Sequence, residues 1–540
     1  MRLRGLSARN APDGAGLAPS ADQQATTVAD TAARGLGGIV AGVLPATLIL
    51  QALSLVSSVV MAHVLGASES TDAYFLALSV PVVTYAILLA ASRLGAIPLL
   101  TSVKKDEPER LSAACSEIVS VTLAAAAGLA IIATLFAVVA IPLASGGSGH
   151  LASTTRQLIL ELAPYAVTGA LAGVLGAILA VEGRFASAVI VLGFEPVLKI
   201  VLVVTAGTQL GVQSLVIGNL VGSSLTVLAL WRLVVRRGIA LRIVPRRTPA
   251  MSSLVKVSAP LLVGQSLLQV NPLVDRMMAS GISPGSVTVL DLALRLVTVP
   301  AALLGSVAIG PLTATWSARF AESGWPGLRE SFARTMVVAV TILPPLAATG
   351  FVLREPVVSA IYAGGAYSDQ AVHSTASALG MFMLGLPAQL TIIAVAMLFV
   401  VRSDVMLPVK IAIANLVINV ALNAAFRGPL GVAGIALSTA VTLTVLCVVY
   451  VVAARRRWGS LGLRAARRPL ALSLLTAVVV GVFGTVLVNG VDATTRWQQI
   501  VLVLALATAA AGLHITALTL GGEMNSDKLR SVRFGLRGRG

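Results

Sequence analysis

Long apolar runs, separated by short polar or charged stretches, recur from residue 37 to residue 521 of this 540-residue chain. Only 11% of the residues are charged, whereas a soluble domain typically has about 25%. The mean hydropathy is +0.93. Such a chain cannot cover an apolar core with a wetted surface, which excludes soluble enzymes, disordered proteins and secreted disulfide scaffolds. The pattern predicts an all-α polytopic membrane protein, because helices satisfy their own backbone hydrogen bonds in lipid.

We expect fourteen transmembrane helices, because fourteen apolar segments are long enough to cross a bilayer. They lie at 37–65, 73–101, 113–145, 155–181, 185–207, 210–235, 251–279, 285–317, 333–353, 371–401, 405–425, 429–454, 469–489 and 497–521. The longest of them need tilt or kinks to fit the bilayer. The polar arm that precedes the first segment is too long and mixed for a simple signal peptide, so we expect a flexible tail.

Basic residues gather in alternate loops between these segments. The other loops hold only Arg156, Arg354, Arg427 and Arg496. By the positive-inside rule, both chain termini are predicted to lie in the cytoplasm, which agrees with an even number of spans. The net charge of +17 therefore reflects membrane topology, and we expect no nucleic-acid partner.

The start of the second half of the chain resembles the start of the first. Both Gln51–Pro81 and Gln265–Pro300 contain a long apolar run, a Gly/Ser turn and a second run with a proline. Six spans separate the copies, so both are predicted to cross in the same direction, in two bundles related by an axis along the membrane normal. Any two Leu/Ala/Val-rich helices look alike, but the shared turn and proline favour a repeat. A substrate is then expected between the bundles, reached by rocking.

Two acid–base pairs are predicted inside the membrane, where ionisable side chains are costly and often functional. Asp291 and Arg295 are four residues apart, so they can pair on one helix face. They form either a site where an anionic ligand competes for the arginine or a structural salt bridge. Glu195 and Lys199 repeat this spacing beside Pro196, and here a buried structural pair is favoured.

Other polar residues are expected near the same cavity. Arg93 lies beside a Gly and a Pro, and is either a cavity cation, which we favour, or a residue that snorkels to the interface. Gln265 and Gln269 form an i, i+4 stripe that could line the cavity. Asp275 and Arg276 are adjacent, hence on different helix faces, and are interpreted as anchors at the membrane interface.

An amide stripe is predicted on the eleventh segment, at Asn415, Asn419 and Asn423. Such stripes usually join helices by hydrogen bonds, and we favour that role over substrate contact. Cys115 and Cys447 lie far apart in apolar runs, so neither a disulfide nor a metal site is expected.

No enzyme signature is present. The sequence has neither a GxxxxGK[ST] phosphate loop nor an HExxH metal motif, and no soluble domain that could hold ATP. His63 and His373 are interpreted as interfacial residues. We expect no cofactor, so an ion gradient, the membrane potential or substrate flow must drive any transport.

Three ordered strings identify a family. The first is VLGASESTDAYFLALSVP, from Val64 to Pro81, and the second is LVDRMMASGISPGSVTVLDLALRLVTVPAALLGSVAIGPL, from Leu273 to Leu312. The third begins with REPVVSAIYAGGAYSDQAV and continues through LGLPAQL, DVMLPVKIAIANLVINVALN and LGVAGIALSTAV. Together they cover much of residues 59–450. The chain resembles the MurJ/MviN family of lipid II flippases, within the multidrug/oligosaccharidyl-lipid/polysaccharide exporter superfamily.

The resemblance implies two pseudo-symmetric six-helix lobes around a cationic cavity, and two further helices that form a groove for a polyprenyl tail. Arg295 stands at the family's essential arginine of the eighth helix, and a guanidinium fork suits a diphosphate. The expected parts are an arm at 1–36, an amino-terminal lobe at 37–236, a basic linker at 237–250, a carboxyl-terminal lobe at 251–454, a basic loop at 455–468, two last helices at 469–521 and a basic tail at 522–540.

The amino-terminal lobe departs from the family pattern. The family's first helix usually carries arginines, and its second reads like RIPNLLRR. The aligned positions here are uncharged: Gln51 and Ser57, then Ser79, Tyr85 and Ala86. Arg93 and Lys199 are candidates to compensate. Fewer cations predict a weaker grip on a diphosphate, or a different substrate.

Four functions follow, of which the first leads. It is a flippase of the bacterial plasma membrane for a polyprenyl-diphosphate-linked cell-wall precursor, lipid II by resemblance. The second is a translocase of another lipid-linked glycan, such as an exopolysaccharide unit. An exporter of amphipathic cations is disfavoured, because its expected carboxylates are here offset by Arg or Lys. The fourth is a non-transporting scaffold that recruits cell-wall synthesis proteins. Membrane lipids are expected partners in every case.

Overall fold

The computed structural model describes residues 45–144, 149–243, 269–402, 404, 406–491 and 495–522. All regular secondary structure in these ranges is helical. Apart from the helices, these ranges contain one isolated β-bridge, between Gly364 and Tyr367. Large apolar side chains such as Phe136 and Phe483 lie exposed on the helix surfaces. A protein that places such residues outward is suited to lipid. The chain is thus an all-α multi-pass membrane protein.

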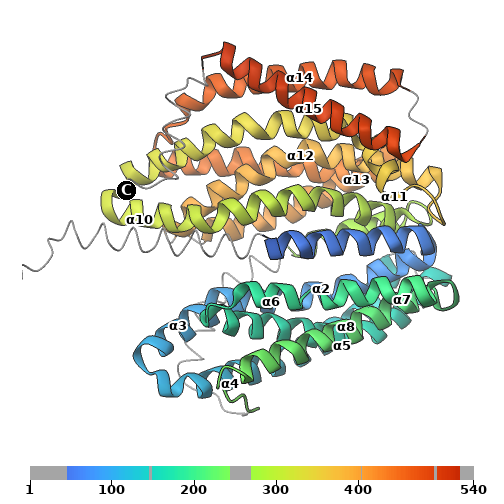
Figure 1. Ribbon diagram of the computed structural model, residues 1–540, viewed down its shortest axis with the longest axis vertical. Helices are drawn as coiled ribbons and strands as arrows, with labels where there is room; N and C mark the ends of the chain where they lie inside the picture. The colour runs from blue at the N-terminus through green and yellow to red at the C-terminus, as the bar shows by residue number, and fades with distance from the viewer. Residues whose placement is uncertain are drawn as a thin grey trace, which may run out of the picture. The chain divides into compact units, whose positions relative to one another are not determined.

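The amino-terminal lobe begins with the helix Pro45–Leu65 and continues through α2. Its elements are α2 (Glu69–Ala91), the π-helical turn η1 (Ser92–Ala96), α3 (Ile97–Asp106), η2 (Pro108–Arg110), α4 (Leu111–Ala144), α5 (His150–Val181), α6 (Phe185–Val191), α7 (Phe194–Leu210) and α8 (Gln213–Val235). Helix α5 packs against α2, α4 and α8, so it lies at the centre of the lobe (Figure 1).

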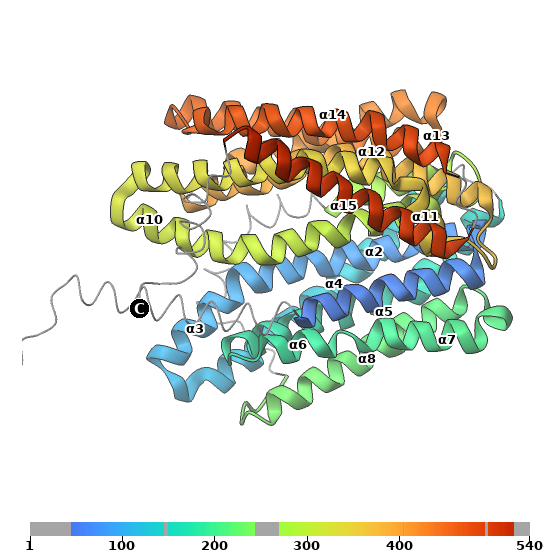
Figure 2. The ribbon, with the colours of Figure 1, turned by 45° about the horizontal axis from the view of Figure 1, so that its top comes forward.

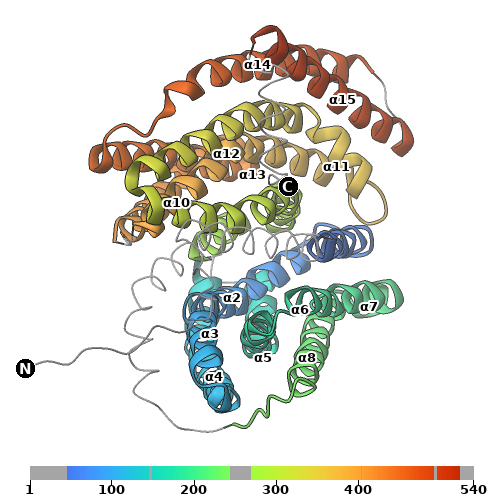
Figure 3. The same cartoon turned by 60° about the vertical axis from the view of Figure 1, so that its left-hand side comes forward.

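The carboxyl-terminal lobe and the last helices form a second group (Figures 1 and 2). Its elements are the helix at 269–280, α10 (Ser286–Val352), α11 (Arg354–Tyr362), α12 (Asp369–Val401), α13 (Met406–Trp458), η3 (Leu463–Ala466), α14 (Arg467–Gly490) and α15 (Arg496–Leu520). Helix α12 packs on both α10 and α13, while α14 covers α10 (Figure 3).

Two of these elements are too long to be single crossings. Helix α10 has 67 residues, or about 100 Å at 1.5 Å per residue, against a hydrocarbon core of about 30 Å. Gly324 interrupts it with a φ of 62°. Figure 2 shows α10 folded back on itself. Gly431 interrupts α13 in the same way, with a φ of 59°. Positive φ favours glycine, so these two residues permit the bends.

Eleven helices in the described ranges are long and apolar enough to cross a membrane. The seventh predicted segment, 251–279, lies largely outside the described residues, and the eighth and ninth lie within α10. The count of fourteen therefore stays a prediction. The second segment is not one straight helix, because a π-helical turn separates α2 from α3, and the fifth is divided between α6 and α7.

Candidate functional site

A buried carboxylate holds two arginines where the lobes meet. The Asp291 side chain is 4% exposed and lies on α10, in a bond of 2.9 Å from Arg295 Nε on the same helix. Arg276, on the helix at 269–280, donates to its other oxygen at 2.5 Å. Arg276 also donates to the hydroxyl of Ser79 on α2 at 2.9 Å. We call Asp291, Arg276, Arg295 and Ser79 the junction cluster, since it connects the lobes.

The junction cluster carries two cations for one anion. One carboxylate can neutralise only one guanidinium group, so the cluster has a net charge of +1. The Arg295 side chain is 33% exposed, and its guanidinium carbon lies 5.9 Å from the centre of the Phe75 ring. Because the bond to Asp291 uses its Nε edge, the terminal nitrogens of Arg295 are the part of the cluster that can take an anionic group.

The structure differs from the interpretation of Asp275 and Arg276 as interface anchors. Asp275 is buried, and it accepts hydrogen bonds from Asn423 at 2.7 Å and from Thr439 at 3.3 Å. Arg276 belongs to the junction cluster. The sequence holds a signal for this pairing, because Arg276 and Asp291 lie at similar distances on either side of the turn that joins their helices. Residues so placed in a helical hairpin face each other.

A second link between the lobes was not anticipated from the sequence. The Asp72 carboxylate, at the start of α2, accepts bonds from the backbone N–H groups of Gly285 and Thr288 at 2.7 and 2.8 Å. The Thr288 hydroxyl donates to Asp72 at 2.8 Å and lies 2.9 Å from the hydroxyl of Thr71. A carboxylate at a helix N-terminus is favourable, because the free N–H groups there carry partial positive charge. We call this contact the Asp72 cap.

Further contacts join the lobes beside the Asp72 cap. The backbone N–H of Ala366 donates to the carbonyl of His63 at 2.7 Å. Arg496, at the start of α15, donates to His63 Nε2 at 2.6 Å and to the carbonyl of Ala363. These contacts lie at the ends of the helices opposite the basic loops, so the two lobes are closed together on that face.

The Glu195–Lys199 pair lies within the amino-terminal lobe. Lys199 Nζ is 3.0 Å from Glu195, and the Tyr165 hydroxyl donates to both Glu195 oxygens at 2.9 Å. The Tyr165 ring meets that of Tyr85 edge-on at 5.7 Å. Beside them is a cavity of about 300 Å³, lined mainly by α5, with further residues from α2, α6 and α8 and with Glu195 of α7. Among the described side chains, no hydrogen bond joins this pair to the junction cluster.

The asparagine stripe is buried on α13 against neighbouring helices. Asn419 and Asn423 are fully buried and Asn415 is 7% exposed. Asn423 donates to Asp275 and to Asn419, and accepts a bond from Ser438. These bonds connect both halves of α13 with the helix at 269–280.

The structure describes only part of the remaining predicted site residues. Gln51 is half-buried on the helix Pro45–Leu65, and Gln269 is half-buried at the start of the helix at 269–280. Arg93 lies in the π-helical turn, but its side chain and the whole of Gln265 fall outside what the structure describes. Nothing joins these residues to the junction cluster in the described part of the chain.

Metal-binding side chains are not clustered in the described ranges. No group of three or more His, Cys, Asp or Glu residues there could hold a metal ion. Cys115 and Cys447 are both free thiols. His373 pairs with Glu355 at 3.2 Å on an exposed surface, where neither side chain lines a described cavity.

Comparisons with known proteins agree with this architecture. The family model described as "Lipid II flippase MurJ" matches residues 61–508. The "Probable lipid II flippase MurJ" of Vibrio cholerae is 27% identical, over 73% of this chain and 78% of the relative. The corresponding protein of Haemophilus influenzae is 26% identical, over 74% of this chain and 82% of its own length.

Solved structures share the fold. A lipid II flippase MurJ in an inward closed conformation gives a TM-score of 0.69 at 20% identity, covering 88% of this chain and 98% of that one. An inward-facing multidrug transporter of the MATE family gives 0.66 at 18% identity, covering 77% and 96%. The family model spans most of the chain, and the chain therefore belongs to the lipid II flippase MurJ family.

Proposed function

We propose that this chain moves lipid II from the inner to the outer leaflet of the bacterial plasma membrane by alternating access. The observation that carries the proposal is Arg295: it is one of two arginines on a single buried carboxylate, and its side chain is 33% exposed at the junction of the lobes. A diphosphate is a strong acceptor for such a fork. Binding there would let a head group cross between lobes that rock against each other.

The last two helices support a lipid-linked substrate. A cavity of about 240 Å³ lies between α10, α14 and α15. Its walls include Val480, Phe483, Leu506 and Leu513, and Thr349 is the only hydroxyl among its lining residues. An apolar hollow of this kind suits a polyprenyl chain, which can stay in contact with lipid while the polar head group crosses.

The proposed cycle follows from the closed face. In the described state the Asp72 cap and the contacts of His63 hold the lobes together opposite the basic loops. If these loops and both termini are cytoplasmic, as the positive-inside rule predicts, the closed face is the outer one, and the proposed cycle loads the site from the cytoplasm in this state. Breaking the cap would then expose the head group to the other side. No ATP-binding motif is present, so the energy must come from a gradient, the membrane potential or substrate flow.

A different lipid-linked glycan is the second candidate. The two cations of the junction cluster both come from the carboxyl-terminal lobe, and the described amino-terminal side contributes only Ser79 and the Phe75 ring. A site with cations on one wall should hold a diphosphate less tightly than a site with cations on both. The lack of described cations on the amino-terminal wall therefore favours a lipid-linked substrate whose head group is held less by a diphosphate and more by its sugars. A scaffold for cell-wall synthesis proteins would need no cation here.

The test measures outer-leaflet exposure of lipid II in bacterial cells whose own flippase can be switched off. The cells express this chain, Arg295→Glu, Arg295→Lys or the control Arg427→Glu, at matched membrane levels. Arg427 is exposed and lies outside the junction cluster, so its reversal changes charge equally without touching the site. We expect this chain and the control to restore the exposure of lipid II. Arg295→Glu should restore none, and Arg295→Lys should restore less than the parent chain.

Each alternative has its own outcome. If the folded, inserted chain restores no lipid II exposure, lipid II is not its substrate, and another lipid-linked glycan takes its place. If Arg295→Glu restores exposure as well as the parent chain, Arg295 does not contact the head group. Loss of cell-wall synthesis without loss of lipid II exposure would instead indicate a scaffold.

A further inference from the structure

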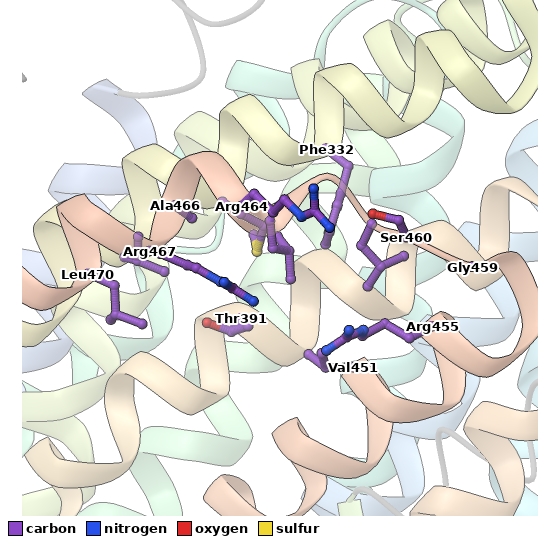
Figure 4. Close-up of a pocket in the computed structure, with 14 residues that line it drawn as sticks. Phe332, Thr391, Val451, Arg455, Gly459, Ser460, Arg464, Ala466, Arg467 and Leu470 are labelled. Carbon is purple, nitrogen blue, oxygen red and sulfur yellow. The ribbon is translucent and has the colours of Figure 1, made fainter.

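A cavity of about 490 Å³, shown in Figure 4, lies beside the basic loop 455–468 of the carboxyl-terminal lobe. It is bounded by the second half of α10, by α12, by the end of α13, by η3 and by the start of α14. The half-buried Val340, Val451 and Leu470 contribute apolar walls. Arg455, Arg464 and Arg467 also line it, and we call this cavity the arginine pocket.

The three arginines come from separate elements and converge on one space. Arg455 is near the end of α13, Arg464 is in η3 and Arg467 begins α14. In Figure 4, Arg455 and Arg467 extend toward each other from opposite walls. None of the fourteen lining residues is acidic, and no ion pair in the described part of the chain includes these arginines. Three like charges around one cavity repel each other, so the arrangement favours an anion.

Neighbouring aromatic residues indicate the level of the pocket in the membrane. Trp458 directly precedes Gly459, which lines the pocket. Its ring lies 5.6 Å from that of Trp325, and the guanidinium of Arg402 lies 5.1 Å from the Trp458 ring. Tryptophan is enriched where a membrane meets water. These residues support placing the mouth of the pocket at the level of the lipid head groups, with its apolar walls toward the acyl chains.

We propose that the arginine pocket binds the head group of an anionic phospholipid. The phosphate would lie between the three guanidinium groups, and the first methylenes of an acyl chain would lie against Val340, Val451 and Leu470. Basic pockets between transmembrane helices on the cytoplasmic side are suited to acidic lipid heads. The volume lies within the range of about 300–1,000 Å³ typical of small-molecule sites. Free phosphate would leave the apolar walls unused, so the observations favour the lipid.

Such a lipid would stabilise the packing of α14 against α10. Helix α14 packs along α10, and Ser473 donates to the carbonyl of Thr341 at 3.0 Å. The pocket contains residues of both helices, so a bound lipid adds contacts that only the folded protein offers. Ligands that bind only the folded state raise thermal stability. This site is separate from the junction cluster, and its test does not depend on the proposed flipping of lipid II.

The experiment measures thermal unfolding of the purified full chain in detergent. Phosphatidylglycerol, zwitterionic phosphatidylcholine or glycerol phosphate is titrated against the chain. We expect phosphatidylglycerol to raise Tm in a saturable way, and the other two to raise it little. The double variant Arg464→Ala/Arg467→Ala should bind phosphatidylglycerol at least about ten-fold more weakly, because two charge-assisted bonds are lost. The matched control is Arg456→Ala/Arg468→Ala: it removes the same charge from adjacent exposed positions outside the pocket, and should keep the response.

Several results would overturn the proposal. Equal weakening in both double variants would mean diffuse attraction to a basic surface. Equal responses to phosphatidylglycerol and phosphatidylcholine would exclude recognition of the anionic head, and a full response to glycerol phosphate would make free phosphate the ligand. If the first double variant does not fold, Arg455→Gln is compared with Arg456→Gln. The Arg455 side chain is exposed and makes no described hydrogen bond, so an unchanged response in that variant would also refute the site.

Discussion

The carboxylate of Asp72 accepts hydrogen bonds from both the backbone nitrogen and the hydroxyl of Thr288, each at 2.8 Å. The two residues are separated by 216 positions and belong to different lobes. Their contact closes the lobes on the face opposite the basic loops. In a transporter that works by alternating access, a bond of this kind stabilises one state and must break to reach the other.

Asp72→Asn should weaken the closed face. The amide keeps the size of the side chain but removes the charge that favours the N-terminus of α10. Losing charge-assisted bonds costs about 1.5–3 kcal/mol, a shift of roughly ten-fold or more in the balance between closed and open states. We expect the opening to be seen at Val287→Cys, which is fully buried here, in a chain without Cys115 and Cys447. Its rate of thiol labelling in lipid nanodiscs should rise about ten-fold.

The control for this experiment is Asp369→Asn. Asp369 is exposed in the first turn of α12, and none of its described contacts reaches the amino-terminal lobe. It should leave the labelling rate unchanged. Equal labelling in the Asp72 and Asp369 variants would show that the cap does not hold the lobes together.

Asp291→Asn should destabilise the chain strongly. The change leaves Arg276 and Arg295 together without an anion, and breaking a buried ion pair typically costs about 3–5 kcal/mol. Glu330→Gln breaks another i, i+4 pair with an arginine, but both partners are more than half exposed, at 66% and 77%. Such surface pairs contribute about 0–1 kcal/mol. Thermal unfolding of the purified variants should therefore show a much larger fall in Tm for Asp291→Asn. Similar falls would mean that Asp291 is not an effective counterion.

The sequence predicts contacts within a helix better than contacts between helices. The pairs Asp291–Arg295 and Glu195–Lys199 follow from a spacing of four residues, which fixes their proximity once the segment is helical. The role of Arg276 does not follow from spacing alone, because it depends on how two helices of a hairpin face each other. Adjacent residues such as Asp275 and Arg276 point to different neighbours, and only the packed structure says which.

The same division applies to the fold. Hydropathy predicts the apolar helices because the bilayer demands them. It does not predict where they bend. Gly324 and Gly431 interrupt α10 and α13 with positive φ angles, and the π-helical turn Ser92–Ala96 connects α2 with α3. The Asp72 cap also cannot be predicted from hydropathy, because it requires the N-terminus of α10 to lie beside the start of α2. Long-range contacts of this kind are set by how the lobes pack.

The Glu195–Lys199 pair should show energetic coupling. Glu195→Gln leaves the Lys199 ammonium, whose side chain is 15% exposed, without its anion, and Lys199→Gln leaves the carboxylate with Tyr165 alone. Each single change should lower Tm. The double change should lower it by less than the sum, since it leaves no unpaired charge. The same cycle on the exposed pair Glu107–Arg110 should be close to additive. Additive effects at Glu195 and Lys199 would contradict a structural pair.

Asn423→Ala should destabilise the chain more than Asn415→Ala. Both side chains are buried on α13, but Asn423 donates to the buried Asp275 carboxylate at 2.7 Å, whereas no hydrogen bond of the Asn415 side chain is described. Hydrogen bonds between transmembrane helices average about 0.6 kcal/mol, with a maximum of about 1.7, and a bond to a buried carboxylate should lie toward the upper end. Thermal unfolding should show the larger fall for Asn423→Ala.

A second variant separates the hydrogen bond from simple loss of packing. In an Asp275→Asn background, the partner of Asn423 is neutral, so losing the donor leaves no unsatisfied charge. Asn423→Ala should then cost less than it does beside Asp275, while the cost of Asn415→Ala should stay the same in both backgrounds. An equal cost of Asn423→Ala in the two backgrounds would assign its effect to packing, and the bond to Asp275 would contribute nothing measurable to joining α13 with the helix at 269–280.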